Sequence, residues 1–270
     1  MFTLGRKIDI KYPTNQIILG ATLILSIIAY FTTGKFSLAI QMGVSLFLTW
    51  ALVREIDCKR EYAAILAAFL TLINLFIPFK VGLGTLFLMI LLLRFVNQIT
   101  GKKKTVLDFI AIMGLAFYVS FSSQNSIYIF LVFLAILIDL KDNENRNLNL
   151  IFLAISFVLY WVLSIGFDYF VYFGEIFTNL PMVLFYGISL LIYFIFIFND
   201  PNKATLDDMG ENASVRKILK GQMYFGFAIF LLLVFSEVAL GTIVVFSSAV
   251  YGFIIYGLFH RFRNKSKAKL

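Results

Sequence analysis

Long apolar runs separated by short polar turns fill most of the sequence. A helix that crosses the hydrocarbon core of a bilayer needs roughly 20 apolar residues, with about 17 as the lower limit. The runs predict ten transmembrane helices, at residues 16–32, 36–53, 62–79, 81–97, 105–121, 126–140, 148–165, 181–198, 222–239 and 242–260. We therefore expect an all-α fold, a polytopic transmembrane helix bundle that forms one integral membrane domain over residues 1–270.

Composition agrees with a protein whose main solvent is lipid. The chain is 61% hydrophobic and 14% charged, whereas a soluble domain carries about 25% charged residues. The net charge of +8 does not indicate nucleic-acid binding, because the basic residues lie between apolar runs and not on one face of a soluble domain. With a single cysteine, Cys58, and a single histidine, His260, the usual zinc sites are excluded, and no cofactor is evident.

The positions of the charges predict the orientation of the chain. If the N-terminus lies inside, every lysine and arginine except Lys35 and Lys80 falls in the N-terminal segment, in the tail or in a cytoplasmic connection, with Arg94 counted at the inner end of its predicted span. Such a distribution is the one that the positive-inside rule describes. We therefore expect the protein to lie in the cytoplasmic membrane with both termini on the cytoplasmic side. The basic tail is then expected to contact anionic lipid headgroups.

Two connections are longer than a turn. Residues 166–180, GFDYFVYFGEIFTNL, are rich in aromatic residues, which favours a short helix in the outer interface. Residues 199–221 form the longest polar segment, and Asp200 before Pro201 fits an N-cap followed by proline at the first helical position. We expect one or two short cytoplasmic helices there.

Charged residues gather where several spans are expected to reach the cytoplasm. Carboxylates could hold Mg²⁺ at these ends, and basic side chains could hold phosphate oxygens. Equally, such residues are typical of solvated helix ends and of cations that set topology. The candidate metal or phosphate residues are Arg54, Asp57, Lys59, Asp139, Asp142 and Asp200.

The stretch Arg54-Glu55-Ile56-Asp57, placed after the second span, resembles part of the first aspartate motif of UbiA-type prenyltransferases. The resemblance implies an intramembrane enzyme that binds a prenyl diphosphate through Mg²⁺. Asp57 matches a metal-binding aspartate of the motif, and Asp139 and Asp142 would stand in the second motif. Val53 occupies the position of the preceding aspartate.

Polar residues inside the predicted spans are few. Arg94 and Asp108 lie at similar depth on either side of one predicted hairpin, so we expect an intramembrane pair between them. Gln41 and Asn74 lie deeper, and either pack between helices or line a polar path.

Three functional classes agree with these patterns. A small carrier of a solute or a lipid fits the compact ten-span layout. A UbiA-like transferase acting on a phosphorylated lipid at the cytoplasmic face fits the acidic clusters, with Mg²⁺ as its cofactor. An accessory subunit that binds other membrane proteins fits the absence of a clear motif.

Overall fold

The computed structural model describes residues 2–6, 9–76, 80–140, 146–174, 180–200 and 205–267, with side chains as far as Arg261. Within these ranges the regular secondary structure is helical, with no strand and one isolated bridge between Leu206 and Asn212. The helices are α1 (Pro13–Thr33), α2 (Phe36–Ile56), α3 (Glu61–Leu70), α4 (Ile73–Phe76), α5 (Leu83–Asn97), α6 (Val106–Ser123), α7 (Ile127–Asp139), α8 (Arg146–Trp161), η1 (Val162–Gly166), α10 (Leu180–Phe198), α11 (Val215–Phe235) and α12 (Leu240–Lys267).

Within the described ranges, seven helical segments are long and apolar enough to cross a membrane: α1, α2, α6, α8 with η1, α10, α11 and α12. The chain is thus an all-helical protein with the helices of a multi-pass membrane protein. The other three predicted spans, 62–79, 81–97 and 126–140, coincide with shorter apolar helices. By helix length alone, seven of the ten predicted transmembrane helices are therefore supported.

Of these three predicted spans, only 62–79 is interrupted, whereas α5 and α7 nearly match the predicted ranges 81–97 and 126–140. The helix α3 stops before Thr71, whose hydroxyl oxygen lies 3.1 Å from the Ala67 carbonyl and 3.0 Å from Thr49 Oγ1, and a turn follows before α4. Gln98 ends α5 with a φ of 52°, the left-handed conformation that commonly caps helices. Gln124, with a φ of 51°, closes α6 in the same way immediately before α7.

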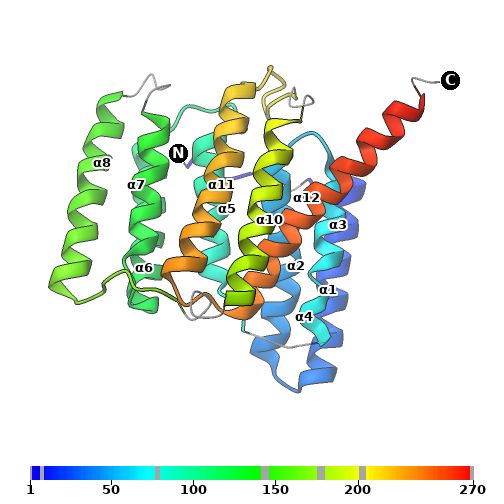
Figure 1. Cartoon of the computed structure of the whole chain (residues 1–270), viewed down its shortest axis with the longest axis horizontal. Coiled ribbons are helices and arrows are strands. Elements are labelled where there is room, and N and C mark those ends of the chain that lie inside the picture. Colours follow the sequence, from blue (N-terminus) through cyan, green and yellow to red (C-terminus); the bar gives the residue numbers. More distant parts are fainter. Residues whose placement is uncertain are drawn as a thin grey trace. The chain divides into compact units, whose positions relative to one another are not determined.

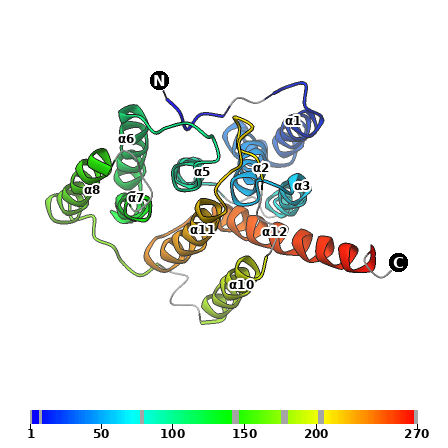
Figure 2. The same ribbon diagram turned by 90° about the horizontal axis from the view of Figure 1, so that it is seen from above.

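The chain forms two compact units. Unit 1 comprises Met1–Arg6 and Phe87–Val238. In it, α6 packs on α7, α7 packs on α8 and α11, and α10 packs on α11 (Figures 1 and 2). The helix α7 is mostly buried, whereas α8 exposes large apolar side chains such as Ile151 and Val158, as expected of a helix in contact with lipid.

Unit 2 comprises Lys7–Leu86 and Ala239–Leu270. The helix α2 packs on α1 and α3, and α12 packs on α2 and α3 (Figure 2). Small residues bring α3 and α12 together: Ala63, Ala64, Ala67 and Ala68 are buried, and Gly252 of α12 lies directly against Ala67. Close backbone approach at small residues is typical of helix packing in membranes.

We expect Gly252→Ala to lower the free energy of unfolding by about 1–3 kcal/mol, the usual cost of overpacking. An added Cβ at Gly252 would lie 2.5 Å from Ala67 Cβ and 2.8 Å from the Ala67 backbone nitrogen, so a helix would have to move. The matched control is Gly114→Ala in α6, where nothing lies within 4 Å and helix propensity predicts a gain of up to about 1 kcal/mol. Thermal unfolding in detergent would measure both, and equal effects would contradict the packing explanation.

The two long connections differ from the sequence prediction. Residues 167–174 are not helical, because their backbone groups bond to neighbouring elements: Tyr169 N–H donates to the Leu163 carbonyl and Gly174 N–H to the Val234 carbonyl. Residues 205–214 are not helical either, since the Asp207 carboxylate accepts from the N–H groups of Met209 and Glu211 and folds a turn. Residues 215–221 of the predicted stretch are helical as the start of α11, and residues 175–179 and 201–204 lie outside the described residues.

Candidate functional site

Polar side chains from four elements of unit 1 converge where α7 ends. Asp139 is the last residue of α7, and Gln98 and Lys104 come from the loop between α5 and α6. Asn149 comes from the first turns of α8, and Lys217 and Lys220 from the first turns of α11. We call these six residues the charged cluster.

Asp139 lies at the centre of the charged cluster. Its Oδ1 atom accepts from Gln98 Nε2 at 2.8 Å and lies 2.6 Å from Lys104 Nζ, and its Oδ2 atom accepts from Asn149 Nδ2 at 2.9 Å. The side chains of Lys104 and Asp139 are only 3% and 2% exposed. A carboxylate at a helix C-terminus is opposed by the helix dipole, so these three donors are what makes a buried charge tolerable there.

The other two lysines of the charged cluster contact Gln98 and the end of α7. Lys217 Nζ donates to Gln98 Oε1 at 2.5 Å, so the Gln98 amide links Lys217 to Asp139. Lys220 Nζ lies 3.4 Å from the Ile138 carbonyl, at the negative end of α7. Of the three lysines, Lys104 lies within ion-pair distance of Asp139, Lys217 is linked to Asp139 through Gln98, and Lys220 lies beside the Ile138 carbonyl.

The charged cluster lies beside the first two turns of α11. The helices α5 and α7 have 15 and 13 residues, or about 22 and 20 Å at 1.5 Å per residue, against about 30 Å of hydrocarbon. Lys220 lies five residues beyond Val215, the start of α11, and still reaches the last turn of α7. The short helices thus leave room for polar groups beside the first turns of α11.

Burial lowers the pKa of Lys104 from 10.5 to about 8, although the attraction of Asp139 opposes the shift. Between pH 8 and 10.5 the unfolded chain therefore holds a proton on this lysine that the folded chain has lost. Stability rises with pH wherever the unfolded state binds more protons.

We accordingly expect the free energy of unfolding to rise between pH 8 and 10.5, by at most about 1.4 kcal/mol per pH unit from this group. Below pH 8 the contribution of Lys104 should not change. Denaturant unfolding of the wild type and of Lys104→Gln across this range would isolate the effect as a difference in slope. Parallel profiles for the two proteins would refute it.

Arg94 and Asp108, the expected intramembrane pair, both bind the N-terminal segment. Asp108 accepts from the backbone and hydroxyl of Thr3, each at 2.6 Å, and from the backbone of Thr105 at 2.7 Å. Arg94 donates to the Leu4 carbonyl at 3.0 Å. The two residues thus act on one segment of the chain, and no direct ion pair joins them in the described part of the structure.

The candidates in unit 2 are engaged with other side chains. Asp57 Oδ2 lies 2.5 Å from Arg60 Nε in a buried ion pair, and the Arg60 guanidinium lies 5.4 Å from the centre of the Phe253 ring. Arg54 pairs with Glu61 at 2.8 Å, and Lys59 is exposed.

Gln41 and Asn74, the expected polar path, contact the backbone of unit 2. Gln41 Oε1 accepts from the Val81 N–H at 3.1 Å, and Asn74 Nδ2 donates to the Gly241 carbonyl at 3.2 Å. Asp200, beyond the end of α10, is buried, whereas Asp142 lies outside the described residues. Within the part of the chain that is described, no group of three or more histidine, cysteine and acidic side chains could hold a metal ion.

Sequence reasoning selected Asp139 but missed its partners. Lys104 is the last of three consecutive lysines, and Lys217 belongs to a longer polar segment, so neither stands out. Asn149, at the start of an apolar span, was the one available signal. Comparisons of the chain with protein-family models, curated proteins and solved structures found no match.

Proposed function

We propose that this protein is a small carrier in the cytoplasmic membrane, a single integral domain that crosses the bilayer ten times with both termini inside. Its cargo binds at the charged cluster. The observation that carries this proposal is the buried Lys104–Asp139 pair at the ends of two short helices.

A buried ion pair suits a carrier for an electrostatic reason. An isolated charge within a membrane is expensive, and ionisable residues there mark substrate pathways. When the site is empty, Asp139 balances Lys104, so the site can change its exposure without carrying an uncompensated charge. A charged cargo competes for Lys104 or Asp139. The ion pair between these residues is then replaced by an ion pair with the cargo.

The contacts within unit 1 support the proposed orientation. The Asp208 N–H donates to the Ile99 carbonyl, and Arg6 pairs with Asp208. The N-terminal segment, the loop after α5 and the loop before α11 therefore meet at one end. All three are segments that the positive-inside rule assigns to the cytoplasm.

A magnesium-dependent transferase is supported less well. Such an enzyme needs carboxylates that are available to the metal. Asp57 is paired with Arg60, and both oxygens of Asp139 accept hydrogen bonds. Magnesium would have to displace these partners before it could bind.

Thiol labelling in sealed vesicles tests the carrier without knowledge of its cargo. Gln98→Cys in a Cys58→Ser background places a thiol in the charged cluster. A carrier exposes its site to both sides in turn, so a membrane-impermeant reagent should label this thiol from either side. The control is Lys102→Cys in the exposed loop, which should react from the cytoplasmic side alone. Labelling of Gln98→Cys from one side only would contradict the carrier.

The same vesicles test the orientation through the natural thiol. Cys58 follows the end of α2 and is partly exposed. We expect an impermeant reagent to label wild-type protein from the cytoplasmic side. Labelling from the outside would show that the proposed orientation is inverted.

A further inference from the structure

The loop between α5 and α6 is held on two sides. Gln98 and Lys104, near its two ends, contact Asp139 of the charged cluster. Between them, the Ile99 carbonyl accepts a hydrogen bond from the Asp208 N–H at 3.0 Å. The loop is therefore bound both to the charged cluster and to the segment that precedes α11.

The segment that precedes α11 folds on itself and buries little apolar surface. The Ala213 N–H donates to the Thr205 carbonyl at 3.0 Å, and we call residues 205–213 the pre-α11 turn. Leu206 and Met209, its large apolar residues, are 59% and 62% exposed. Segments with few buried apolar contacts open locally at a small cost in free energy. The pre-α11 turn can therefore leave its neighbours while the helices stay folded.

Gly101 brings the pre-α11 turn against the backbone of the loop. Its φ of 68° lies in the left-handed region that favours glycine. A Cβ added to Gly101 would lie 2.5 Å from Asp207 Oδ2 and 2.8 Å from Met209 Cγ. Side chains of the pre-α11 turn therefore fill the space beside Gly101 and restrict the movement of the loop.

The N-terminal segment fastens the pre-α11 turn as well. Arg6 pairs with Asp208, and both side chains are 26% exposed. Two residues before Arg6, the Leu4 carbonyl accepts from Arg94 of α5. An ion pair as exposed as Arg6–Asp208 contributes little free energy, so this fastening breaks and forms again readily.

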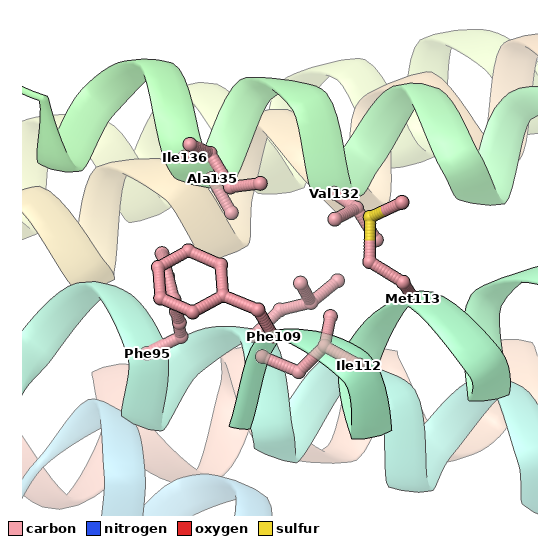
Figure 3. A pocket seen from close by; sticks show the side chains of 8 residues that line it. Phe95, Phe109, Ile112, Met113, Val132, Ala135 and Ile136 are labelled. Carbon is pink, nitrogen blue, oxygen red and sulfur yellow. The ribbon is translucent and has the colours of Figure 1, made fainter. Parts of the chain in front are cut away.

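Towards the middle of α7, apolar side chains close the charged cluster. Phe95 of α5 and Phe109 of α6 face Val132 and Ile136 of α7 across a space too narrow for a water molecule (Figure 3). The Phe95 ring also lies 3.8 Å from Lys104 Nζ, so this apolar layer borders the charged cluster directly. Because Lys104 is buried beside the layer, access to it requires movement of the loop that carries it.

We propose that the pre-α11 turn is a latch on the α5–α6 loop, and that the charged cluster opens to the cytoplasm when the latch is released. With the latch bound, the loop holds Lys104 against Asp139 and the cluster is closed. When the pre-α11 turn leaves, Ile99 and Gly101 lose their contacts with it, and the loop moves outward with Lys104. This inference rests on the proposed carrier and identifies the cytoplasmic gate of its site.

Acetylation of lysine by sulfosuccinimidyl acetate, which does not cross membranes, tests the latch with the charged cluster intact. The reagent is applied to the cytoplasmic side of sealed vesicles, and mass spectrometry reads the rate at each lysine. Arg6→Ala and Asp208→Ala each remove the ion pair and should raise the rate at Lys104 about two- to fivefold. The rate at the exposed Lys102 should not change. The control Glu61→Ala removes an ion pair of similar exposure from unit 2, and an equal increase at Lys104 in this control would overturn the latch.

Fastening the latch should have the opposite effect. Arg6→Cys with Asp208→Cys, in a Cys58→Ser background, places two thiols that a short bis-methanethiosulfonate reagent bridges. The bridge should slow the acetylation of Lys104 below the wild-type rate, and reduction of the bridge should restore it. A rate at Lys104 that is the same in the released and the bridged protein would refute the latch.

The latch and the carrier fail in different experiments. If Lys104 responds as expected but Gln98→Cys is labelled from one side only, the carrier is refuted and the latch stands as a gate on a cytoplasmic site. If Gln98→Cys is labelled from both sides but the rate at Lys104 does not respond, the carrier stands and the latch is refuted.

Discussion

Replacing Lys104 with methionine is expected to lower the free energy of unfolding by about 3–5 kcal/mol, the usual cost of removing one partner of a buried ion pair. The Asp139 carboxylate would remain buried at the C-terminus of α7, where the helix dipole opposes it. Gln98 and Asn149 would still donate to it, but neither carries a compensating charge. Thermal or denaturant unfolding of the purified protein in a mild detergent measures the loss.

The double variant Lys104→Met with Asp139→Leu separates charge from packing. Removing both charges is often neutral or stabilising, so we expect the double variant to recover most of the stability that the single variant loses. The control, Lys102→Met on the exposed part of the loop, should change stability by no more than about 0.5 kcal/mol. A double variant as unstable as Lys104→Met would show that the loss does not come from an unpaired Asp139.

The apolar runs predict the helices closely but miss a break inside one of them. Residues 62–79 read as one continuous span, yet the side chain of Thr71 bonds to Ala67 and Thr49 and the helix breaks there. The predicted ranges 81–97 and 126–140, in contrast, nearly match α5 and α7; Gln98 follows α5 in the left-handed conformation, and Gln124 ends α6 in the same conformation before α7 begins. Hydropathy indicates whether a segment favours lipid or water. Where a helix stops is decided by the backbone conformation at a single residue.

The candidate site was predictable in part. Asp139 was selected as a carboxylate at the end of a span, with a second carboxylate and magnesium as its expected partners. In the structure a lysine takes that place. Which of the three lysines 102–104 turns inward depends on the loop backbone, and Gly101, with a φ of 68°, directs that loop. A left-handed turn of this kind leaves no periodic signal in the sequence.

The expected Arg94–Asp108 pair shows a different limit of predicting contacts from the sequence. The two residues do lie in elements of unit 1 that approach each other, but a segment far away in the sequence competes for both. Thr3 and Leu4 supply donors to Asp108 and an acceptor to Arg94, and Leu4 is buried. The spacing between Arg94 and Asp108 carries no information about a third segment that binds both of them from about ninety residues or more away.

Replacing Asp108 with alanine is expected to release the N-terminal segment from unit 1 and to lower stability by about 3 kcal/mol. The carboxylate accepts from Thr3, Leu4 and Thr105 at once, and its bond to the Thr105 backbone begins α6 as part of a capping box. Loss of a cap costs about 0.5–2 kcal/mol, and each buried donor left without an acceptor adds roughly 1–3 kcal/mol. Leu4 would also lose its burial.

Hydrogen exchange of the N-terminal peptide, read by mass spectrometry, measures the release directly. In Asp108→Ala the amides of Thr3 and Leu4 should exchange much faster than in the wild type, while the centre of α7 keeps its protection. The control is Asp208→Ala, which removes the exposed pair with Arg6 and should cost no more than about 1 kcal/mol. Because Arg94 also binds this segment, full protection of Thr3 and Leu4 in Asp108→Ala would show that Arg94, and not Asp108, holds the N-terminus in place.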